Sequence, residues 1–557
     1  MCWLLPVPAS RAQRPIAAAL ASLLVSSTAL PLRAAEVLQV QLDGLSVPVD
    51  LKALEAWSQD PARDRSELGV WLGLLDQRSR STLVQLLREP LLRDQSLGSQ
   101  LLNSWAGEPL INEIAALLSP SQPRQPTATV PEIATAGMLR RSLDDLLSRQ
   151  RQVTLLELLR ALPAERVSLK LDGVIELAQQ WRRQLELQQR ALRRLDGLGL
   201  PQRQSSPLTL SERQGGPLVA MALAVNHRRE PLPLQIWPSQ GRARGPWILL
   251  MPGLGGSSGQ LSWLAASLAQ WGWPVVVLDH PGSNEAALQA SLIGQQPPPG
   301  SESLAQRLAD VEAVLQAQRQ GQLPALGAPA GAPVVLMGHS LGGLTALMAA
   351  GLTPEEGLGR RCRQALSRLP LSNLSRLLQC QLPQGRSGRR PAPSPVTPVA
   401  AIVAYNGFGS LLWPSRGLED LKAPLLLVGG SLDLITPPLV EQLAVFSSQR
   451  HPRSRLVLLE GGSHFSPVRL PANDQALFRL GDDLVGIEPR KAQSLLLLLT
   501  LEFLKGLEQP LLLSPQVRRL SGVRAHVLDP PLARRWSHAI RTPDGDPARP
   551  PARRPAP

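Results

Sequence analysis

The chain has 557 residues, too many for one ordinary domain and enough for two domains with additional tails. Hydrophobic residues make up 43% of the sequence and charged residues 18%, a composition that suits a soluble globular protein. The formal net charge of +14 comes from arginines spread along the chain, whereas a nucleic-acid interface gathers basic residues on one face among stacking aromatic residues. The composition therefore argues against nucleic acid as a partner and leaves peripheral association with an anionic membrane open.

The N-terminus has the pattern of an export signal. Arg11 and Arg14 precede an apolar run at Ile16–Val25, and small residues follow as far as Ala34-Ala35. A basic segment, a short apolar run and small residues near a cleavage point are typical of a signal peptide. We therefore expect residues 1–35 to be a signal peptide and the protein to be secreted or to reside in the periplasm or cell envelope. An uncleaved membrane anchor is the alternative.

Residues 36–200 are predicted to form a hairpin followed by a mainly helical domain. Apolar and polar residues alternate on both sides of Asp43-Gly44, a dipeptide that favours the two-residue turn of a β-hairpin. Thr154 and Glu157 have the spacing of a capping box, which predicts that a helix begins there. The region contains no cluster of catalytic residue types, so the sequence does not indicate its role.

Residues 201–510 have the alternation of strands and helices that is typical of an α/β domain. Several of the predicted strands are continuous runs of valine and leucine, as expected where both faces of a parallel sheet are buried. We therefore predict a mostly parallel sheet sandwiched by helices. The predicted strands are Val219–Val225, Leu232–Trp237, Trp247–Met251, Val275–Leu278, Val334–Met337, Ala400–Ala404, Leu425–Val428 and Leu456–Leu459.

Two inserts interrupt this alternation, at Asn284–Ala332 and at Thr353–Pro398, and the second is rich in arginine, proline and serine. Because both inserts follow elements near the carboxyl edge of the sheet, we expect them to cover the mouth of a site at that edge. Residues 511–557 are rich in proline and arginine, and we expect them to form a largely disordered tail.

The strongest motif is Gly338-His339-Ser340-Leu341-Gly342, which follows a buried strand and precedes a helix of small residues. This is the G-x-S-x-G nucleophile elbow, a strand-to-helix turn so tight that the serine takes strained backbone angles. The flanking glycines give the room that such a turn needs. Ser340 then projects at the N-terminus of a helix, where negative charge is stabilised, and is our predicted nucleophile.

A nucleophilic serine needs a base, and the base needs an acid that orients it. In this kind of fold the acid follows the serine in the chain and the histidine follows the acid. Asp433 lies just beyond the strand Leu425–Val428, and His464 lies in a glycine-rich loop after the next strand. We therefore predict Asp433 as the acid and His464 as the base.

Other histidines are weaker candidates for the base. His451 lies in a turn before a strand, and His526 and His538 lie in the expected tail. His339 belongs to the elbow, where we expect its side chain to point away from the substrate. Glu460 ends the strand before His464 and is at best a substitute for the acid.

Acyl transfer also needs donors that stabilise an oxyanion. We predict the backbone amide of Leu341, the residue after the nucleophile, and that of Leu254 in a glycine-rich loop after a strand. Gly253 and Gly255 let this loop approach a ligand closely, so we predict that both contact the substrate. His280 is a further candidate for contact with the substrate, with a plain turn as the equally weighted alternative.

Two cysteines, Cys362 and Cys380, remain after the predicted signal. In an oxidising compartment an even pair within one segment favours a disulfide over two free thiols. The pair lacks the CxxC spacing and the neighbouring histidines of a metal site, so we predict neither a metal nor a cofactor.

At these positions the sequence resembles the α/β-hydrolase superfamily, and within it the bacterial predicted dienelactone hydrolases that are related to platelet-activating-factor acetylhydrolases. The resemblance covers about residues 206–510. Residues 35–195 resemble more faintly a helical domain of unknown function that precedes some of these hydrolases. The motifs that carry the resemblance are Gly253–Gly256, Asp279–Ser283, Gly338–Gly342, Gly430–Asp433 and Ser463–Phe465.

The resemblance implies an α/β-hydrolase fold and an esterase that acts on small-molecule or lipid acyl esters through Ser340, Asp433 and His464. Two departures matter. Dienelactone hydrolases proper use a cysteine nucleophile, and many relatives carry His-Gly where this chain has Pro252-Gly253.

The sequence favours a serine ester hydrolase without a cofactor. An acyltransferase or a peptidase on the same fold, and a non-catalytic binding protein on a hydrolase fold, are the alternatives. The inserts lack a long apolar helix that would open at a lipid interface, and the second insert is rich in arginine. We therefore expect a preference for short acyl chains on soluble or partly polar esters.

Overall fold

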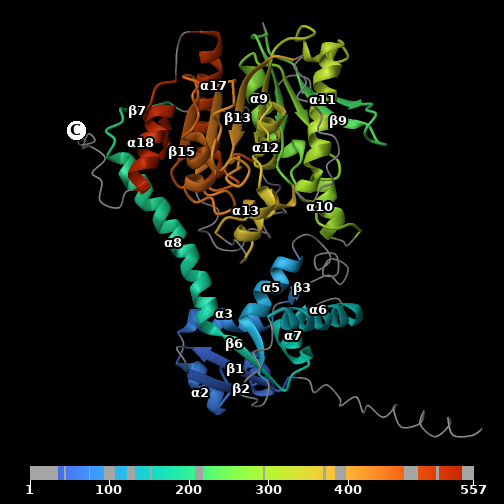
Figure 1. Cartoon of the computed structure of the whole chain (residues 1–557), viewed down its shortest axis with the longest axis vertical. Helices are drawn as coiled ribbons and strands as arrows, with labels where there is room; N and C mark the ends of the chain where they lie inside the picture. The colour runs from blue at the N-terminus through green and yellow to red at the C-terminus, as the bar shows by residue number, and fades with distance from the viewer. Residues whose placement is uncertain are drawn as a thin grey trace, which may run out of the picture.

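The computed structural model describes residues 35–42, 45–74, 76–88, 90–92, 107–121, 132–150, 153–206, 218–241, 243–292, 295–367, 372–382, 397–469, 487–509 and 513–541. These residues form two bodies connected by the long helix α8 (Leu171–Asp196), which runs from one body to the other in Figure 1. Among the described helices, none combines the length and the apolar character that a membrane span requires. Residues 1–34, nearly all of the predicted signal peptide, lie outside the described residues.

The first body is built on a four-stranded sheet in the order β2-β1-β6-β4. The first two strands pair antiparallel with Leu42 opposite Leu45, which confirms the hairpin predicted around Asp43-Gly44. The prediction of a mainly helical domain missed the third and fourth strands of this sheet. The strands are β1 (Val37–Leu42), β2 (Leu45–Asp50), β4 (Leu118–Ser121) and β6 (Arg166–Lys170), with a separate pair β3 (Pro90–Leu92) and β5 (Val153–Thr154).

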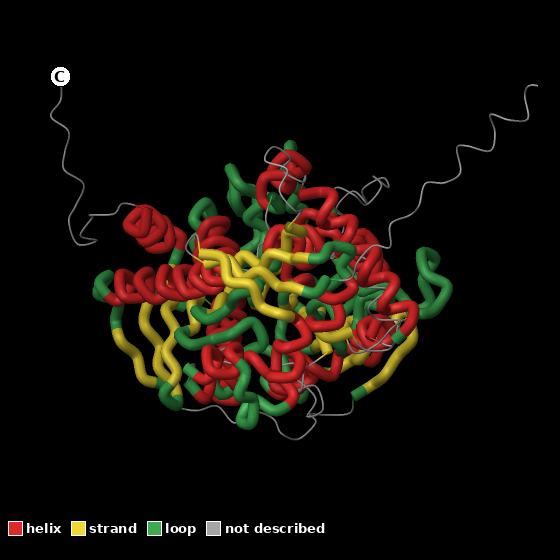
Figure 2. Tube along the Cα trace, turned by 90° about the horizontal axis from the view of Figure 1, so that it is seen from below, coloured by secondary structure: helices red, strands yellow, loops and turns green. Residues whose placement is uncertain are grey.

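Helices lie beside these strands, as the view from below shows (Figure 2). The capping box predicted at Thr154 is present at the start of the last of them, because Thr154 Oγ1 accepts from the Glu157 amide at 3.2 Å and Glu157 Oε2 accepts from the Thr154 amide at 2.7 Å. Trp57 is fully buried in the core of this body. The helices are α1 (Leu51–Gln59), α2 (Glu67–Gly73), α3 (Gln77–Arg88), α5 (Gly107–Leu117), α6 (Glu132–Arg149) and α7 (Leu155–Ala161).

The second body contains an 11-stranded sheet in the order β7-β16-β17-β15-β14-β13-β12-β10-β11-β9-β8. The six strands from β15 to β11 in this order pair parallel. Antiparallel pairings follow on both sides, through β17 and β16 on one side and through β9 and β8 on the other, and the edge strand β7 pairs parallel with β16. Figure 1 shows β7 and β9 at opposite sides of the body. The strands are β7 (Gln202–Gln204), β8 (Val219–Leu223), β9 (Leu232–Trp237), β10 (Trp247–Met251), β11 (Val275–Leu278), β12 (Val334–His339), β13 (Val399–Tyr405), β14 (Leu425–Gly430), β15 (Arg455–Leu459), β16 (Gln516–Leu520) and β17 (Val523–Leu528).

Helices cover both faces of this sheet, which confirms the predicted α/β sandwich. The parallel strands are buried along their whole length except at the first two residues of β13, and a separate apolar core lies on each face. One core contains α11 (Leu304–Arg319), α12 (Leu341–Ala349), α15 (Ala444–Phe446) and α18 (Pro530–Arg541), and the other contains α9 (Ser258–Gln270) and α17 (Pro489–Glu508). Continuous valine and leucine runs are needed because each of these strands contacts both cores.

The predicted boundaries of this body need two corrections. Residues 513–541 are ordered rather than disordered, because β16, β17 and α18 complete the sheet and one of its cores. At the other end, the C-terminal part of α8 belongs to the second body, since Ala191 and Leu195 are buried in the same core and Trp536 Nε1 donates to the Ala191 carbonyl at 3.0 Å. The boundary between the two bodies therefore lies within α8 and not at residue 200 as predicted.

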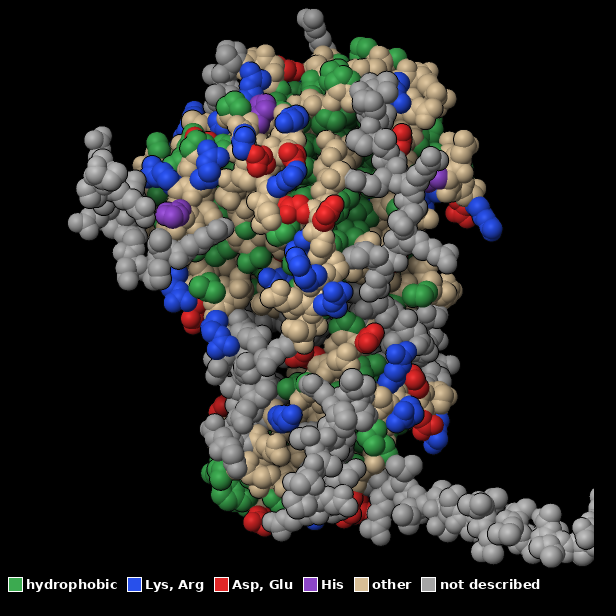
Figure 3. All heavy atoms as spheres, viewed as in Figure 1, with side chains coloured by type: hydrophobic (Ala, Val, Ile, Leu, Met, Phe, Trp, Pro, Cys, Tyr) green, Lys and Arg blue, Asp and Glu red, His purple; other side chains and the backbone are tan. Residues whose placement is uncertain are grey.

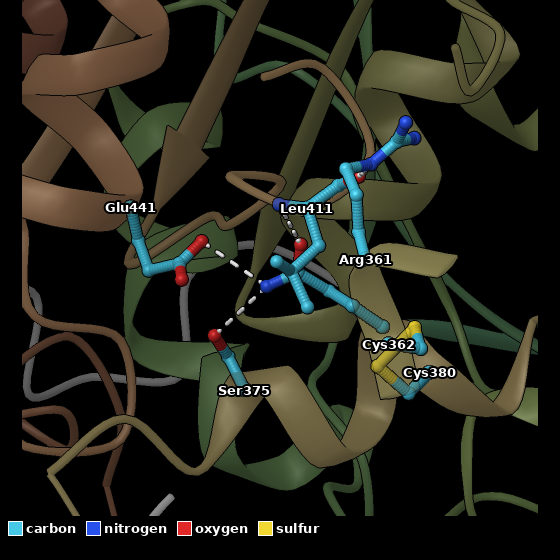
Figure 4. The surroundings of a disulfide bond; sticks show 7 residues. Arg361, Cys362, Ser375, Cys380, Leu411 and Glu441 are labelled. Carbon is cyan, nitrogen blue, oxygen red and sulfur yellow. Dashed lines mark hydrogen bonds between the residues drawn. A yellow bond between two sulfur atoms is a disulfide. The ribbon is translucent and has the colours of Figure 1, made fainter. Parts of the chain in front are cut away.

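The two inserts fold as short helices around the sheet. In the first, α11 is an ordinary crossover helix that packs on α12, preceded by α10 (Glu285–Leu292) and η1 (Ser301–Ser303) and followed by η2 (Pro324–Leu326). The second contains α13 (Leu358–Ala365) and α14 (Ser375–Gln381), and the predicted disulfide between Cys362 and Cys380 joins them (Figure 4). The arginines at 368, 386, 389 and 390 of this insert lie outside the described residues.

Buried polar contacts fix α14 to the sheet domain. Gln379 Nε2 donates to Ser375 Oγ at 3.1 Å and to Glu441 Oε2 at 3.2 Å, and Gln379 Oε1 accepts from the Leu411 amide at 2.7 Å (Figure 4). Glu441 lies in the π-helix η3 (Leu439–Leu443), which follows the loop of Asp433. The second insert is thus attached beside the predicted acid.

Charged side chains of both signs are interspersed on the face shown in Figure 3. Apolar side chains gather over α2 at the lower end of the same view. The large apolar side chains most exposed in the first body are Leu45, Val47, Val70, Trp71 and Leu74.

Candidate active site

The elbow around Ser340 has the geometry that the motif predicts. Ser340 connects β12 to α12 with φ 53° and ψ −117°, a backbone conformation that side-chain-bearing residues rarely adopt. A Cβ at Gly338 would lie 2.3 Å from the carbonyl carbon of Gly342, and a Cβ at Gly342 would lie 2.4 Å from the Met251 carbonyl oxygen. Both flanking glycines are therefore required because backbone passes directly over them.

The structure brings the three predicted residues into one hydrogen-bonded chain. Ser340 Oγ lies 3.0 Å from His464 Nε2, and His464 Nδ1 lies 2.9 Å from Asp433 Oδ2. Asp433 follows β14, and His464 follows β15, so each arrives at the same carboxyl edge as the elbow after β12. Asp433 is fully buried, and Ser340 and His464 are each 6% exposed.

Besides His464, one side-chain amide, one hydroxyl and two backbone amides bond to Asp433. Its Oδ2 accepts from Asn406 Nδ2 at 2.7 Å and from Thr436 Oγ1 at 2.5 Å, and its Oδ1 accepts from the amides of Ile435 and Thr436 at 2.9 and 2.8 Å. Burial alone raises the pKa of Asp433, but the charge of His464 and the hydrogen bonds from His464 and Thr436 outweigh it, so this pKa lies below its usual value. The carboxylate therefore stays ionised and orients the imidazole.

Asn406 and Thr436 are site residues that the sequence analysis missed. Asn406 directly follows β13 and has φ 51°, a left-handed conformation that asparagine adopts more readily than most residues. A polar residue after a buried strand, in the sequence Tyr405-Asn406-Gly407, was the signal that could have indicated it. Thr436 lies three residues after the acid, a spacing that favours a local turn bond.

The side chain of His339 contacts the loop of His464. Its Nε2 donates to the backbone carbonyl of His464 at 2.8 Å, and the two rings lie 4.9 Å apart. Burial, together with the neighbouring charge of His464, lowers the pKa of His339 to about 3, so the ring is neutral at physiological pH. His339 therefore holds the loop of His464 without adding a second charge to the site.

The predicted oxyanion loop lies against the serine. It follows β10, and a Cβ at Gly253 would lie 3.2 Å from Ser340 Cβ and 3.0 Å from His339 Nδ1. Gly255 has φ 67°, and a Cβ there would lie 2.9 Å from Leu288 Cδ2. Both glycines are thus positions of close approach, whereas their contact with a substrate stays a prediction.

The comparisons with known families agree with this division of the chain. Residues 248–477 match the model described as "Alpha/beta hydrolase family", and this segment contains the oxyanion loop, the elbow, Asp433 and His464. The chain contains an α/β-hydrolase domain. Residues 34–170 match the model described as "Alpha/beta hydrolase of unknown function (DUF1400)", which ends where β6 ends. No curated protein matches the chain.

One predicted contact of the α/β-hydrolase domain is not supported. His280 was expected to contact a substrate, but its side chain is fully buried and its Nδ1 lies 2.9 Å from Asp310 Oδ2. Burial, and next the positive charge of Arg307, lower the pKa of His280 to about 4. The same carboxylate accepts from Arg228 and contacts His227, so His280 belongs to a buried charge cluster that holds the turn after β11.

Another group of the hydrolase domain has ligand types that metals use. Asp196, Glu460 and His526 offer atoms within 4.8 Å of one another. Arg524 already forms ion pairs with both carboxylates, to Asp196 at 2.6 Å and to Glu460 at 3.1 Å, so a positive charge of the chain itself bridges them. Glu460 thus bonds to His526 and Arg524, and this network joins the end of α8 to the strand before His464.

Proposed function

We propose that the protein is a serine ester hydrolase of the dienelactone hydrolase and platelet-activating-factor acetylhydrolase type. The observation that carries the proposal is the unbroken chain of hydrogen bonds from Ser340 through His464 to Asp433, at a strained elbow. The family match supports hydrolase activity in general terms. The serine, the imidazole and the ionised carboxylate are the groups that acyl transfer needs, in contact and in the required order.

In this mechanism His464 Nε2 takes the proton of Ser340 Oγ as the oxygen attacks the ester carbonyl. The resulting oxyanion is stabilised by backbone amides, for which we propose Leu341 and the loop of Leu254. The tetrahedral intermediate collapses to an acyl-enzyme, and His464 gives the proton to the departing alkoxide. Water, activated by the same imidazole, then releases the carboxylic acid and restores Ser340.

We also propose that short acyl chains on soluble or partly polar esters are preferred. Ser340 and His464 expose little surface, which favours a small acyl group. The second insert lies beside the site, because the Ser375 amide donates to the Ile435 carbonyl at 2.9 Å, two residues after Asp433. Arg361 is engaged with the carbonyls of Leu411, Glu355 and Glu356, whereas Arg360 and Arg363 are exposed, where they favour anionic groups over bare hydrocarbon.

Export to an oxidising compartment is part of the same proposal. The disulfide between Cys362 and Cys380 supports it, because such bonds persist outside reducing compartments. The predicted signal peptide points in the same direction.

The test uses a fluorophosphonate probe and p-nitrophenyl esters of two to about sixteen carbons. We expect the wild type to be labelled and to turn over the short esters fastest, without a jump in rate above the micelle threshold. Ser340→Ala should lose labelling and nearly all turnover while keeping the wild-type circular dichroism spectrum. A Ser340→Ala protein that hydrolyses esters at the wild-type rate would overturn the proposal, and a maximum at long chains would overturn the acyl preference.

A further inference from the structure

A buried arginine holds the loop that carries the predicted oxyanion donor. Arg307 lies in α11 and is fully buried. Its Nη1 donates to the Pro252 carbonyl at 2.9 Å and its Nη2 to the Gly253 carbonyl at 2.9 Å. Its other bonds go to Ser283, from Nε to Oγ at 2.8 Å and from Nη2 to the carbonyl at 3.2 Å. One guanidinium thus fixes two successive peptide groups of the loop.

Because the peptide group is planar, the direction of each carbonyl also sets the direction of the amide in the same group. The carbonyl of Pro252 shares a peptide plane with the amide of Gly253, and the carbonyl of Gly253 shares one with the amide of Leu254. In a trans peptide the C=O and N–H bonds point in opposite directions, so two carbonyls on Arg307 leave two successive amides facing away from it. Successive amides on one side of a chain form a concavity that binds anions.

The loop that contains the amides of Gly253 and Leu254 lies against Ser340. A Cβ at Gly253 would lie 3.2 Å from Ser340 Cβ, so the loop passes next to the nucleophile. Among the described backbone groups, neither the Gly253 nor the Leu254 amide donates to another residue, whereas the amides of Gly255 and Gly256 are bonded to the carbonyls of Ser283 and Gly253. Two unbonded donors therefore belong to a loop that passes next to Ser340, where an oxyanion would need donors.

The charge of Arg307 adds to this effect. All four of its acceptors are uncharged oxygens, and the nearby Asp310 bonds instead to Arg228, His227 and His280. Burial lowers the pKa of Arg307 to about 9, so the guanidinium remains charged at neutral pH. A charged donor on a peptide carbonyl polarises that peptide and makes its amide a stronger donor.

We propose that Arg307 is a positioning residue for the oxyanion hole, which orients and polarises the amides of Gly253 and Leu254 toward the negative charge that develops on the substrate carbonyl oxygen. This inference rests on the proposed ester hydrolysis. It also explains why a positive charge is buried in the molecule without a carboxylate as direct hydrogen-bond partner.

The experiment compares matched esters and thionoesters, because the sulfur of a thionoester is a weak acceptor and gains less from an oxyanion hole. Arg307→Lys keeps the charge but cannot reach all four oxygens, and Arg307→Gln removes the charge. In both we expect kcat for the ester to fall about 10- to 100-fold with little change in KM, and the ester-to-thionoester rate ratio to fall about 10-fold. Rates are expressed per active site titrated in the same sample.

The matched control is Arg228→Lys, because Arg228 is a neighbouring and largely buried arginine that bonds to Asp310 and the Pro281 carbonyl rather than to the loop. This variant should lose stability and leave the rate ratio unchanged. If Arg307→Lys does not fold, Ser283→Ala takes its place, since it removes one anchor of the guanidinium and should lower the ratio about twofold or more.

The outcomes separate the two proposals. A wild type that hydrolyses no ester and takes up no fluorophosphonate would defeat the proposed function itself. An active wild type whose Arg307 and Ser283 variants lose rate equally on both substrates, with the ratio unchanged, would show a purely structural role and overturn the inference.

Discussion

At the scale of single residues, the serine and its partners were predictable because their signals are local. Ser340 lies in a motif whose glycines the tight turn demands, and Asp433 and His464 each follow a predicted strand. Their order in the chain then makes their meeting at one sheet edge the expected result. The hydrogen bonds of 3.0 and 2.9 Å between them agree with that expectation.

Residues that act through long-range contacts were not predictable in this way. Asn406 and Arg307 reach their partners from segments 27 and 54 or 55 residues away. Neither belongs to a motif with a known spacing, and a buried arginine looks like a surface charge in a sequence. His280 is the converse case, because a turn after a strand suggested substrate contact whereas the distant Asp310 makes the histidine part of the core.

Asp433 and the groups that bond to it should differ in how much their replacement lowers kcat. Asp433→Asn should lower kcat by several orders of magnitude, because the amide cannot stabilise the imidazolium, whereas Asn406→Ala should lower it about tenfold. Thr436 and two backbone amides still hold the carboxylate in Asn406→Ala. The measurement is kcat on a short p-nitrophenyl ester. Equal losses in the two variants would mean that Asn406 does more than orient the acid.

Asp433→Asn should also differ from the wild type in acid stability. The pKa of Asp433 in the folded protein lies below the ordinary value of 3.8, so its ionised form contributes stability above about pH 4 that is lost as the pH falls through the folded value. Asp433→Asn should therefore show a shallower loss of stability in this acidic range than the wild type. Urea unfolding at several pH values measures the difference.

At the scale of elements, predicted strands match best where both faces are buried. Trp247–Met251 and Val275–Leu278 have the bounds that their apolar runs predict, and Leu232–Trp237, which is buried mainly on one face, matches as well. β16 and β17 were missed because they carry arginines and a histidine. Arg518 is buried in β16, where Glu502 and Ser205 bond to it, and Ser205 lies 313 residues away in the sequence.

The C-terminal strands give a prediction about truncation. A chain that ends at Arg541 keeps β16, β17 and α18 and should fold and hydrolyse esters like the wild type. A chain that ends at Gln509 leaves β15 as an exposed edge and removes Trp536 from the core, so it should aggregate. The soluble yield and the thermal unfolding of the two truncated proteins are compared with those of the wild type. A soluble, active protein ending at Gln509 would show that these elements are dispensable.

The disulfide gives a second prediction at this scale. Cys362 and Cys380 are 18 residues apart, and closing a loop of this length contributes about 3 kcal/mol by restricting the unfolded chain. Replacing both cysteines with serine should lower the free energy of unfolding by about that amount. Wild-type protein treated with a reductant is the matched control and should lose a similar amount. Two free thiols in protein recovered from its native compartment would contradict the predicted bridge.

At the scale of the whole molecule, α8 unites the two bodies. Its C-terminal part contacts the hydrolase domain through Arg194 Nη1, which donates to the Ala539 carbonyl at 2.6 Å, and through the ion pair of Asp196 with Arg524. Gln188 Nε2 lies 3.5 Å from the carbonyl oxygen of Asp433. The connection between the bodies thus reaches the loop of the acid, which no local sequence pattern indicates.

This arrangement predicts that residues on different faces of α8 have very different effects on the hydrolase domain. Leu195 is fully buried in the core that also contains Trp536, whereas Leu187 on the same helix is 47% exposed. Leu195→Ala removes packed methyl groups and should lower the free energy of unfolding by about 2–5 kcal/mol. Leu187→Ala should change it by less than about 1 kcal/mol, because that side chain loses little burial. For both variants, urea unfolding is monitored through the loss of esterase activity, which reports on the hydrolase domain. If Leu195→Ala destabilises only the first body and leaves the activity midpoint unchanged, α8 is a linker and not part of the hydrolase core.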